Sequence, residues 1–178
     1  MKAILLLLPL ATAVSCAVPT AVGNDFAPQQ MRFGAHAAVA TSTGSSDEGG
    51  YALGDSFTLE GGYFYSDNIE IGGTAEFWTY DQADVQMYTG FARYYLQTEG
   101  NVRPYLLIGV GLYDVTNTER EGSGDVYRLG AGISQFLSDT TSFDISVEEH
   151  FSSYVDETRT SEIDSDTMNI YLGFNVML

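Results

Sequence analysis

Eight segments of this 178-residue chain alternate apolar and polar residues with a period of two, which limits the fold more than any other feature. Successive side chains of a β-strand point to opposite faces, so the pattern predicts strands with one apolar and one polar face. Turn-forming stretches separate the segments. The predicted strands cover residues 30–42, 56–65, 69–80, 85–96, 105–116, 125–137, 141–154 and 166–178. We therefore predict an all-β fold.

The connections between these segments differ at the two ends. Short turns follow the second and sixth segments, and a slightly longer connection spans residues 97–104. The other four connections are residues 43–55, 81–84, 117–124 and 155–165, and three of these are long, polar and acidic. Short turns at one end and longer loops at the other are typical of an up-and-down transmembrane barrel with its turns in the periplasm.

The polar faces of the segments carry isolated charges of both signs among Gly and Ser residues. A strand face washed by water usually carries Lys and Thr instead, whereas small residues and opposite charges suit a narrow interior. Eight strands leave an interior just wide enough for side chains. We therefore predict an eight-stranded antiparallel barrel whose apolar faces contact lipid. Its predicted internal ion-pair network comprises Arg32, Glu60, Glu76, Arg93, Arg128, Asp144 and Glu148, with Glu70 on the same face.

A soluble, lipocalin-like periplasmic binder is the alternative fold for this pattern. In that case Phe33, Ile71, Ile145 and Phe174 would lie in the centre of the barrel. The charged residues of the opposite face would then contact water. The direction of the two faces therefore decides between a membrane protein and a soluble carrier.

The first residues have the features of a secretory signal peptide. Lys2 supplies a positive start, and the apolar run of residues 3–13 is too short to cross a bilayer as a helix. We expect residues 1–17 to form the signal peptide and residues 18–29 to form an N-terminal linker. The barrel would then cover residues 30–178.

The cleavage point of this signal is open, because small residues occur at two suitable places. Residues 13–16 also resemble a bacterial lipoprotein box, in which the Cys becomes the lipidated N-terminus. Cys16 is therefore either a lipidation site or part of the removed signal peptide.

Composition excludes several classes of function. The chain has 24 acidic and 7 basic residues and a net charge of −17, so we expect no nucleic-acid binding. Its single Cys excludes an internal disulfide framework and a Cys-based zinc site. The acidic loops lack EF-hand spacing, and we interpret them as solvated surface rather than as a Ca²⁺ site. We expect no metal and no cofactor.

Aromatic residues gather near the ends of the predicted strands. Membrane barrels place such residues in girdles at the two interfaces, where one end of the ring is apolar and the other is wet. The predicted girdle residues are Tyr63, Tyr65, Phe77, Tyr80, Tyr94, Tyr95, Tyr105, Tyr113, Phe143, Phe151 and Tyr154.

The last ten residues, 169–178, alternate strictly to the end of the given sequence. They resemble the C-terminal assembly signal of bacterial outer-membrane barrels, with Tyr171, Gly173, Val176 and Leu178 at its spacing. Leu178 stands where that signal usually has Phe. The resemblance implies recognition by the barrel assembly machinery.

Two further motifs, RPYLLIGVGLY at residues 103–113 and GAGISQFLSD at 130–139, resemble the small outer-membrane barrels of the OmpA/OmpX type. This resemblance covers about residues 30–178 and implies a bacterial outer-membrane location in contact with outer-membrane lipids. It implies a non-enzymatic structural or surface-interaction role. The loops at 43–55, 117–124 and 155–165 would face outside and contact any extracellular ligand.

An enzymatic alternative rests on His150 and Ser152. A His-x-Ser pair with a nearby Glu resembles the catalytic set of an outer-membrane lipid A deacylase, and Glu148 and Glu162 are candidate acids. Ser153 stands where that family has Asn. Alternation also places His150 and Ser152 on the interior face, whereas the deacylase site faces the membrane.

Overall fold

The computed structural model describes residues 28–42, 55–79, 83–98, 100–117, 121–156 and 162–178. The predicted signal peptide with Cys16, most of the linker and residues 43–54 of the first long loop lie outside these ranges.

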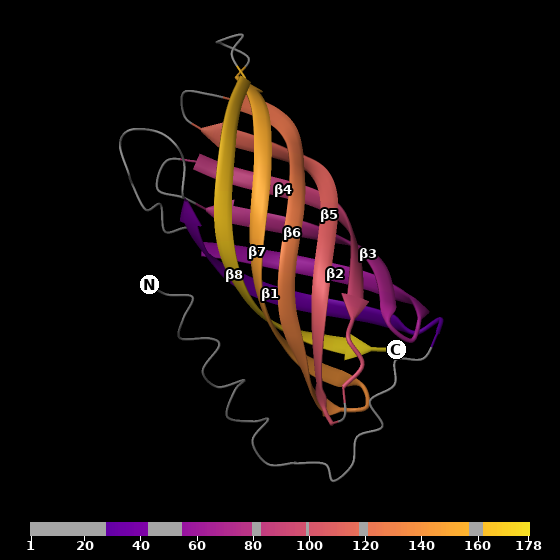
Figure 1. Ribbon diagram of the computed structural model, residues 1–178. Coiled ribbons are helices and arrows are strands. Elements are labelled where there is room, and N and C mark those ends of the chain that lie inside the picture. Colours follow the sequence, from indigo (N-terminus) through magenta and orange to yellow (C-terminus); the bar gives the residue numbers. More distant parts are fainter. Residues whose placement is uncertain (1–27, 43–54, 80–82, 99, 118–120, 157–161) are drawn as a thin grey trace.

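The chain forms a closed barrel of eight antiparallel strands, as the alternation predicts (Figure 1). Each strand pairs with its neighbours in sequence, and β1 pairs with β8 to close the sheet. The strands are β1 (Met31–Ser42), β2 (Asp55–Ser66), β3 (Ile69–Thr79), β4 (Ala83–Tyr95), β5 (Val102–Asn117), β6 (Glu121–Ser138), β7 (Thr141–Asp156) and β8 (Glu162–Met177). No helix in the described ranges has the length and apolar character needed to cross a bilayer.

The apolar faces of the strands point outward and the charged faces point inward. Phe33 is 46% exposed and Ile71 is 47% exposed, whereas Arg32 is fully buried and Arg93 is 2% exposed. This is the orientation of a barrel surrounded by lipid. The soluble, lipocalin-like alternative is therefore wrong, because it requires the reverse.

Strands β5 to β8 extend further into the predicted outer loops than the sequence pattern indicates. Strand β6 begins at Glu121 instead of residue 125, and β8 begins at Glu162 instead of residue 166. The connections predicted at 117–124 and 155–165 are therefore shorter, and β7 and β8 project beyond the other strands at the top of Figure 1. The prediction failed here because backbone pairing, such as that of Gly122 with Asp156, needs no apolar side chain.

Three of the predicted girdle aromatics lie inside the barrel. Tyr95, Tyr105 and Tyr113 are each at most 5% exposed, whereas Tyr63 and Tyr94 are exposed on the outer wall. The first three share the strand parity of the charged residues, which is why they point inward. Position near a strand end alone did not distinguish the two groups.

Neighbouring glycines on β3 have opposite roles. Gly72 faces inward, and a Cβ there would collide with the Gly61 carbonyl and would lie 2.6 Å from Cζ of Phe91. Gly73 faces outward, and the nearest atom to its Cβ would be the Thr89 carbonyl oxygen at an ordinary 3.4 Å. Only Gly72 is therefore required by the packing of the barrel itself.

We predict that Gly72→Ala lowers the free energy of unfolding by about 1–3 kcal/mol, because the added methyl group overpacks the wall. The matched Gly73→Ala variant should change it by less than roughly 0.5 kcal/mol. Urea unfolding in lipid vesicles measures both. Equal effects of the two substitutions would contradict this account.

Candidate functional site: the polar interior of the barrel

All seven residues of the predicted ion-pair network lie inside the barrel, together with Glu70. They come from six of the eight strands, and each is at most 6% exposed. Their distances divide them into two clusters, which we call the Arg32 cluster and the Arg128 cluster. The Arg32 cluster lies toward the end of the barrel that carries the short turns.

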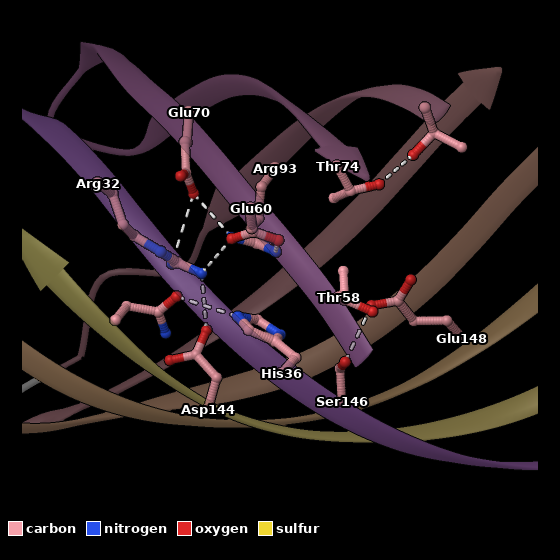
Figure 2. Close-up of polar contacts among 12 residues, drawn as sticks. Arg32, His36, Thr58, Glu60, Glu70, Thr74, Arg93, Asp144, Ser146 and Glu148 are labelled. Carbon is pink, nitrogen blue, oxygen red and sulfur yellow. Dashed lines mark hydrogen bonds and ion pairs between the residues drawn. The ribbon is translucent and has the colours of Figure 1, made fainter. Parts of the chain in front are cut away.

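The Arg32 cluster joins strands that are far apart in sequence (Figure 2). Nη2 of Arg32 donates to Glu60 at 2.6 Å and to Asp144 at 2.9 Å. Nη1 of Arg32 lies 3.5 Å from Glu70 and also donates to the Tyr95 hydroxyl. One guanidinium from β1 therefore ties together β2, β3, β4 and β7 across the interior.

Arg93 completes this cluster from β4. It lies directly opposite Glu70 in the β3–β4 register, and its Nη1 is 2.9 Å from that carboxylate. Both carboxylate oxygens of Glu60 also accept from Arg93 at 2.9 Å. The guanidinium carbon lies 4.8 Å from the centre of the Phe91 ring and 4.6 Å from that of Tyr105, so rings flank the charge.

Small residues make room for these long side chains. Gly62 lies opposite Arg32 in the β1–β2 register. A Cβ on Gly62 would collide with the carboxylate of Glu70. In the same way, Gly130 lies opposite Glu148, and its Cβ would approach that side chain to 2.6 Å.

Arg128 of β6 forms the centre of the second cluster. Its Nε donates to Glu148 at 3.1 Å, and its Nη2 contacts the same carboxylate oxygen at 2.5 Å. Its Nη1 donates to the hydroxyls of Thr74 and Thr89, each at 2.8 Å. Ser146 donates to the other oxygen of Glu148 at 2.9 Å. The ion pair is thus completed by neutral hydroxyl groups from β3, β4 and β7.

Glu76 is held mainly by neutral donors. It accepts from Nε1 of Trp78 at 2.7 Å, from the Tyr171 hydroxyl at 2.9 Å and from Thr58 at 3.3 Å. Arg128 is 4.0 Å away, at the limit of an ion pair. The eight network residues include five carboxylates and three guanidiniums. Neutral donors therefore solvate the excess negative charge in place of water.

The hydrogen bonds around Tyr171 fix the tautomer of His150. The Tyr171 hydroxyl has one proton, which it donates to Glu76, because a carboxylate accepts only. Nε2 of His150 lies 3.1 Å from the same hydroxyl and must therefore be the donor in that bond. In the neutral ring Nδ1 is then an acceptor, and it is buried without a partner among the described residues.

Two apolar clusters pack among and next to the polar side chains of the interior. The cluster toward the short turns consists of Phe64, Phe91, Tyr95, Tyr105, Leu107, Phe136 and Met177. The cluster toward the long loops consists of Ala38, Trp78, Met87, Tyr113, Val126 and Tyr171, with Val85 and Val115 packed against it. Buried apolar and aromatic side chains are therefore interleaved with the charged groups inside the wall.

Five members of this network were not predicted from the sequence, namely Thr74, Thr89, Trp78, Tyr95 and Tyr171. Four of them share the inward parity of charged residues on their own strands, and Tyr171 shares the parity of the buried Asn169 on β8. Parity was the available signal. Parity does not say which inward residues meet across the barrel, because those contacts depend on strand tilt and register.

The proposed catalytic pair does not lie on the membrane face. His150 is 2% exposed inside the barrel and lies 3.8 Å from Glu148. Ser152, two residues further along β7, is partly buried and lies on the same face of the strand as His150. The side chain of Glu162 lies outside the described residues. Within the described part of the chain, no three His, Cys, Asp or Glu side chains are grouped so that they could hold a metal ion.

The predicted C-terminal signal is divided between the two faces of β8. Tyr171 and Gly173 point inward and are buried, whereas Val176 and Leu178 are exposed on the outer wall. A Cβ on Gly173 would collide with the His36 ring. Tyr171 and Gly173 therefore have packing roles that would require them even without an assembly signal.

Comparison with known proteins identifies the family. A family model described as the outer membrane protein beta-barrel domain matches residues 7–177. The chain belongs to this family. The protein is therefore located in the bacterial outer membrane. The apolar side chains on the outer wall of its barrel agree with this location. No curated protein sequence matches the chain significantly.

Solved structures show the same fold at low sequence identity. Neisserial surface protein A matches with a TM-score of 0.64 and 14% identity over 83% of this chain and 95% of that one. The N-terminal barrel domain of Pseudomonas aeruginosa OprF matches with 0.58 and 17% over 84% and 99%. The outer membrane enzyme PagL matches with 0.52 and 10% over 80% and 98%. Because these structures include an enzyme, the fold by itself does not decide whether the barrel is catalytic.

We predict that Arg128→Met destabilises the outer-membrane barrel by about 3–5 kcal/mol, because it leaves the Glu148 carboxylate buried without its counter-charge. Adding Glu148→Gln should recover part of this loss, since the stranded group is then neutral. Urea unfolding in vesicles gives all three free energies. Strictly additive effects of the two substitutions would contradict the buried pair.

We predict that ¹⁵N NMR finds His150 as the Nε2–H tautomer when the ring is neutral, because the Tyr171 hydroxyl accepts that proton. Tyr171→Phe removes the acceptor and should alter the His150 ring shifts, while His36 serves as the internal control. A neutral ring protonated on Nδ1 would contradict the assigned direction of the hydrogen bonds.

Proposed function

We propose that the protein is a non-enzymatic integral barrel that anchors a set of acidic surface loops in the outer membrane. In this proposal the short turns face the periplasm and the long loops face outside. The loops predicted at residues 43–55, 117–124 and 155–165, together with the strand ends that extend into them, then serve a structural or surface-interaction role and contact any extracellular ligand.

The observation that supports this proposal most is the filled interior. Arg32 alone contacts three carboxylates and one hydroxyl, and Arg128 contacts groups from three other strands. Two apolar clusters fill the space next to both ion-pair clusters. A solute would have to break buried ion pairs to pass, and leaving one partner uncompensated costs about 3–5 kcal/mol. This arrangement favours an anchor over a channel.

The position of His150 supports a non-enzymatic role. A hydrolase acting on a membrane lipid needs its nucleophile and base where the lipid can reach them. His150 is buried in the interior and its Nε2 bonds to Tyr171. This geometry gives the deacylase-like alternative no support.

Two kinds of partner follow from the proposal. The exposed apolar wall contacts outer-membrane lipids. The barrel assembly machinery recognises the C-terminal signal, which consists of Tyr171, Gly173, Val176 and Leu178, and inserts the barrel. Both remain expectations that accompany the anchoring role.

We predict that the refolded barrel gives no steady ion conductance in planar lipid bilayers, because its interior is filled by paired charges and buried apolar side chains. An Arg32→Ala/Arg93→Ala variant removes two of the three guanidiniums of the ion-pair network and provides the comparison. Heat-dependent gel migration confirms that both proteins are folded. Regular single-channel steps from the unmodified protein would refute the anchoring role.

Proteoliposomes that contain the refolded barrel and lipid A test the enzymatic alternative. We expect the acyl chains of lipid A to stay intact in mass spectra. Their release by the unmodified barrel, and not by His150→Ala, would establish the hydrolase instead.

A further inference from the structure

The outer wall contains an apolar groove of about 860 Å³ that crosses β3, β4 and β5 and reaches β2. Tyr63, Ile71, Ile108 and Val110 form its sides, and each of them is exposed. Ala92 and Gly90 lie between these larger side chains. The groove is thus a hollow in the same surface that contacts lipid.

Strand register explains why the hollow lies here. Tyr63, Ile71, Ala92 and Ile108 are successive partners across the four strands. In the next row toward the long loops, Gly61, Gly73, Gly90 and Val110 are successive partners. Of this row, Gly90 and Val110 line the groove, and Gly90 leaves a gap in the wall beside the bulky Val110.

The outward glycines are not required by the packing of the barrel. The nearest atoms to a Cβ on Gly90 would be two backbone oxygens at 3.9 Å, and a Cβ on Gly61 would meet the Phe33 ring at 3.7 Å. These are ordinary contact distances. By contrast, the inward Gly111 would collide with the Tyr88 carbonyl. The wall would accommodate a side chain at Gly90, so the packing of the barrel does not explain the hollow there.

The surroundings determine what fills the groove. Water is absent from the hydrocarbon layer, and an empty hollow would lose dispersion contacts on its lining atoms. A hydrocarbon chain seated in the groove is contacted from its sides as well as from below, whereas a chain on the convex wall is contacted on one side. Packing, rather than the hydrophobic effect, drives association within a bilayer.

We infer that this groove binds one acyl chain of a glycerophospholipid from the leaflet next to the short turns. The groove lies near that end, because Ile71 is close to the start of β3 and Tyr63 is close to the end of β2. The choice of leaflet rests on the proposed orientation, with the short turns in the periplasm. The exposed Tyr63 and Tyr94 place hydroxyl groups on the side where the headgroup would lie.

A second copy of the barrel fits the groove less well. Nine residues line it, whereas a stable protein interface uses about 20–30 residues on each side. A narrow hollow between bulky side chains suits a flexible chain better than another convex wall. The lipid is therefore the occupant to which we commit.

The test is native mass spectrometry of the full barrel after reconstitution in vesicles of phosphatidylethanolamine, phosphatidylglycerol and lipid A, followed by extraction in mild detergent. We expect the unmodified barrel to retain one phospholipid. Gly90→Leu fills the groove and should lower the retained fraction about tenfold, which corresponds to ~1.4 kcal/mol. Ala131→Leu adds a similar side chain to the exposed wall of β6, outside the groove, and should retain the lipid as the unmodified barrel does.

Ile108→Ala is a second variant that should also lower the retained fraction of phospholipid, because it removes one side of the groove without adding bulk. Heat-dependent gel migration checks that each variant is folded. Equal retention by Gly90→Leu and Ala131→Leu would overturn the inference, as would retention of lipid A or a dimer that Gly90→Leu abolishes. If the unmodified barrel conducts ions but still retains a phospholipid that Gly90→Leu displaces, only the proposed function is refuted and the lipid site stands.

Discussion

The hydrocarbon layer offers no water to backbone amide and carbonyl groups, and the architecture of this protein follows from that constraint. A sheet in such a medium must close on itself so that every strand has two neighbours. Pairing of β1 with β8 closes the sheet here. Closure then creates two separate environments, a wall that contacts lipid and an interior that must be filled by side chains.

The interior is filled in a way that keeps buried charge compensated. Arg32, Arg93 and Arg128 each contact more than one acceptor, and the Trp78 and Tyr171 donors serve the carboxylate of Glu76. Buried ion pairs are weak contributors to stability compared with apolar packing, but they penalise any arrangement that separates them. The network therefore favours one register of the eight strands, which is consistent with an anchor whose interior does not change.

The fold was predictable from the sequence because the alternation of apolar and polar residues can be recognised along the chain without knowing any tertiary contact. It gave the number of strands, and it gave the inward direction of Arg32 and Glu148. The prediction failed where the local residue pattern disagrees with the strand pairing and side-chain packing of the folded barrel. The polar residues around Gly122 looked like a loop but extend the strands through backbone pairing. Tyr95 and Tyr105 looked like interfacial aromatics but pack inside.

The sequence by itself determined the class of fold, the direction of each face and the inward direction of the charged network residues, because alternation assigns every side chain to a face. Only the tertiary structure decided which of those residues meet, such as Arg32 with Asp144 and Tyr171 with Glu76. It also revealed the outer groove around Gly90. Both depend on register between strands that are distant in sequence, and register is set by the closed sheet as a whole.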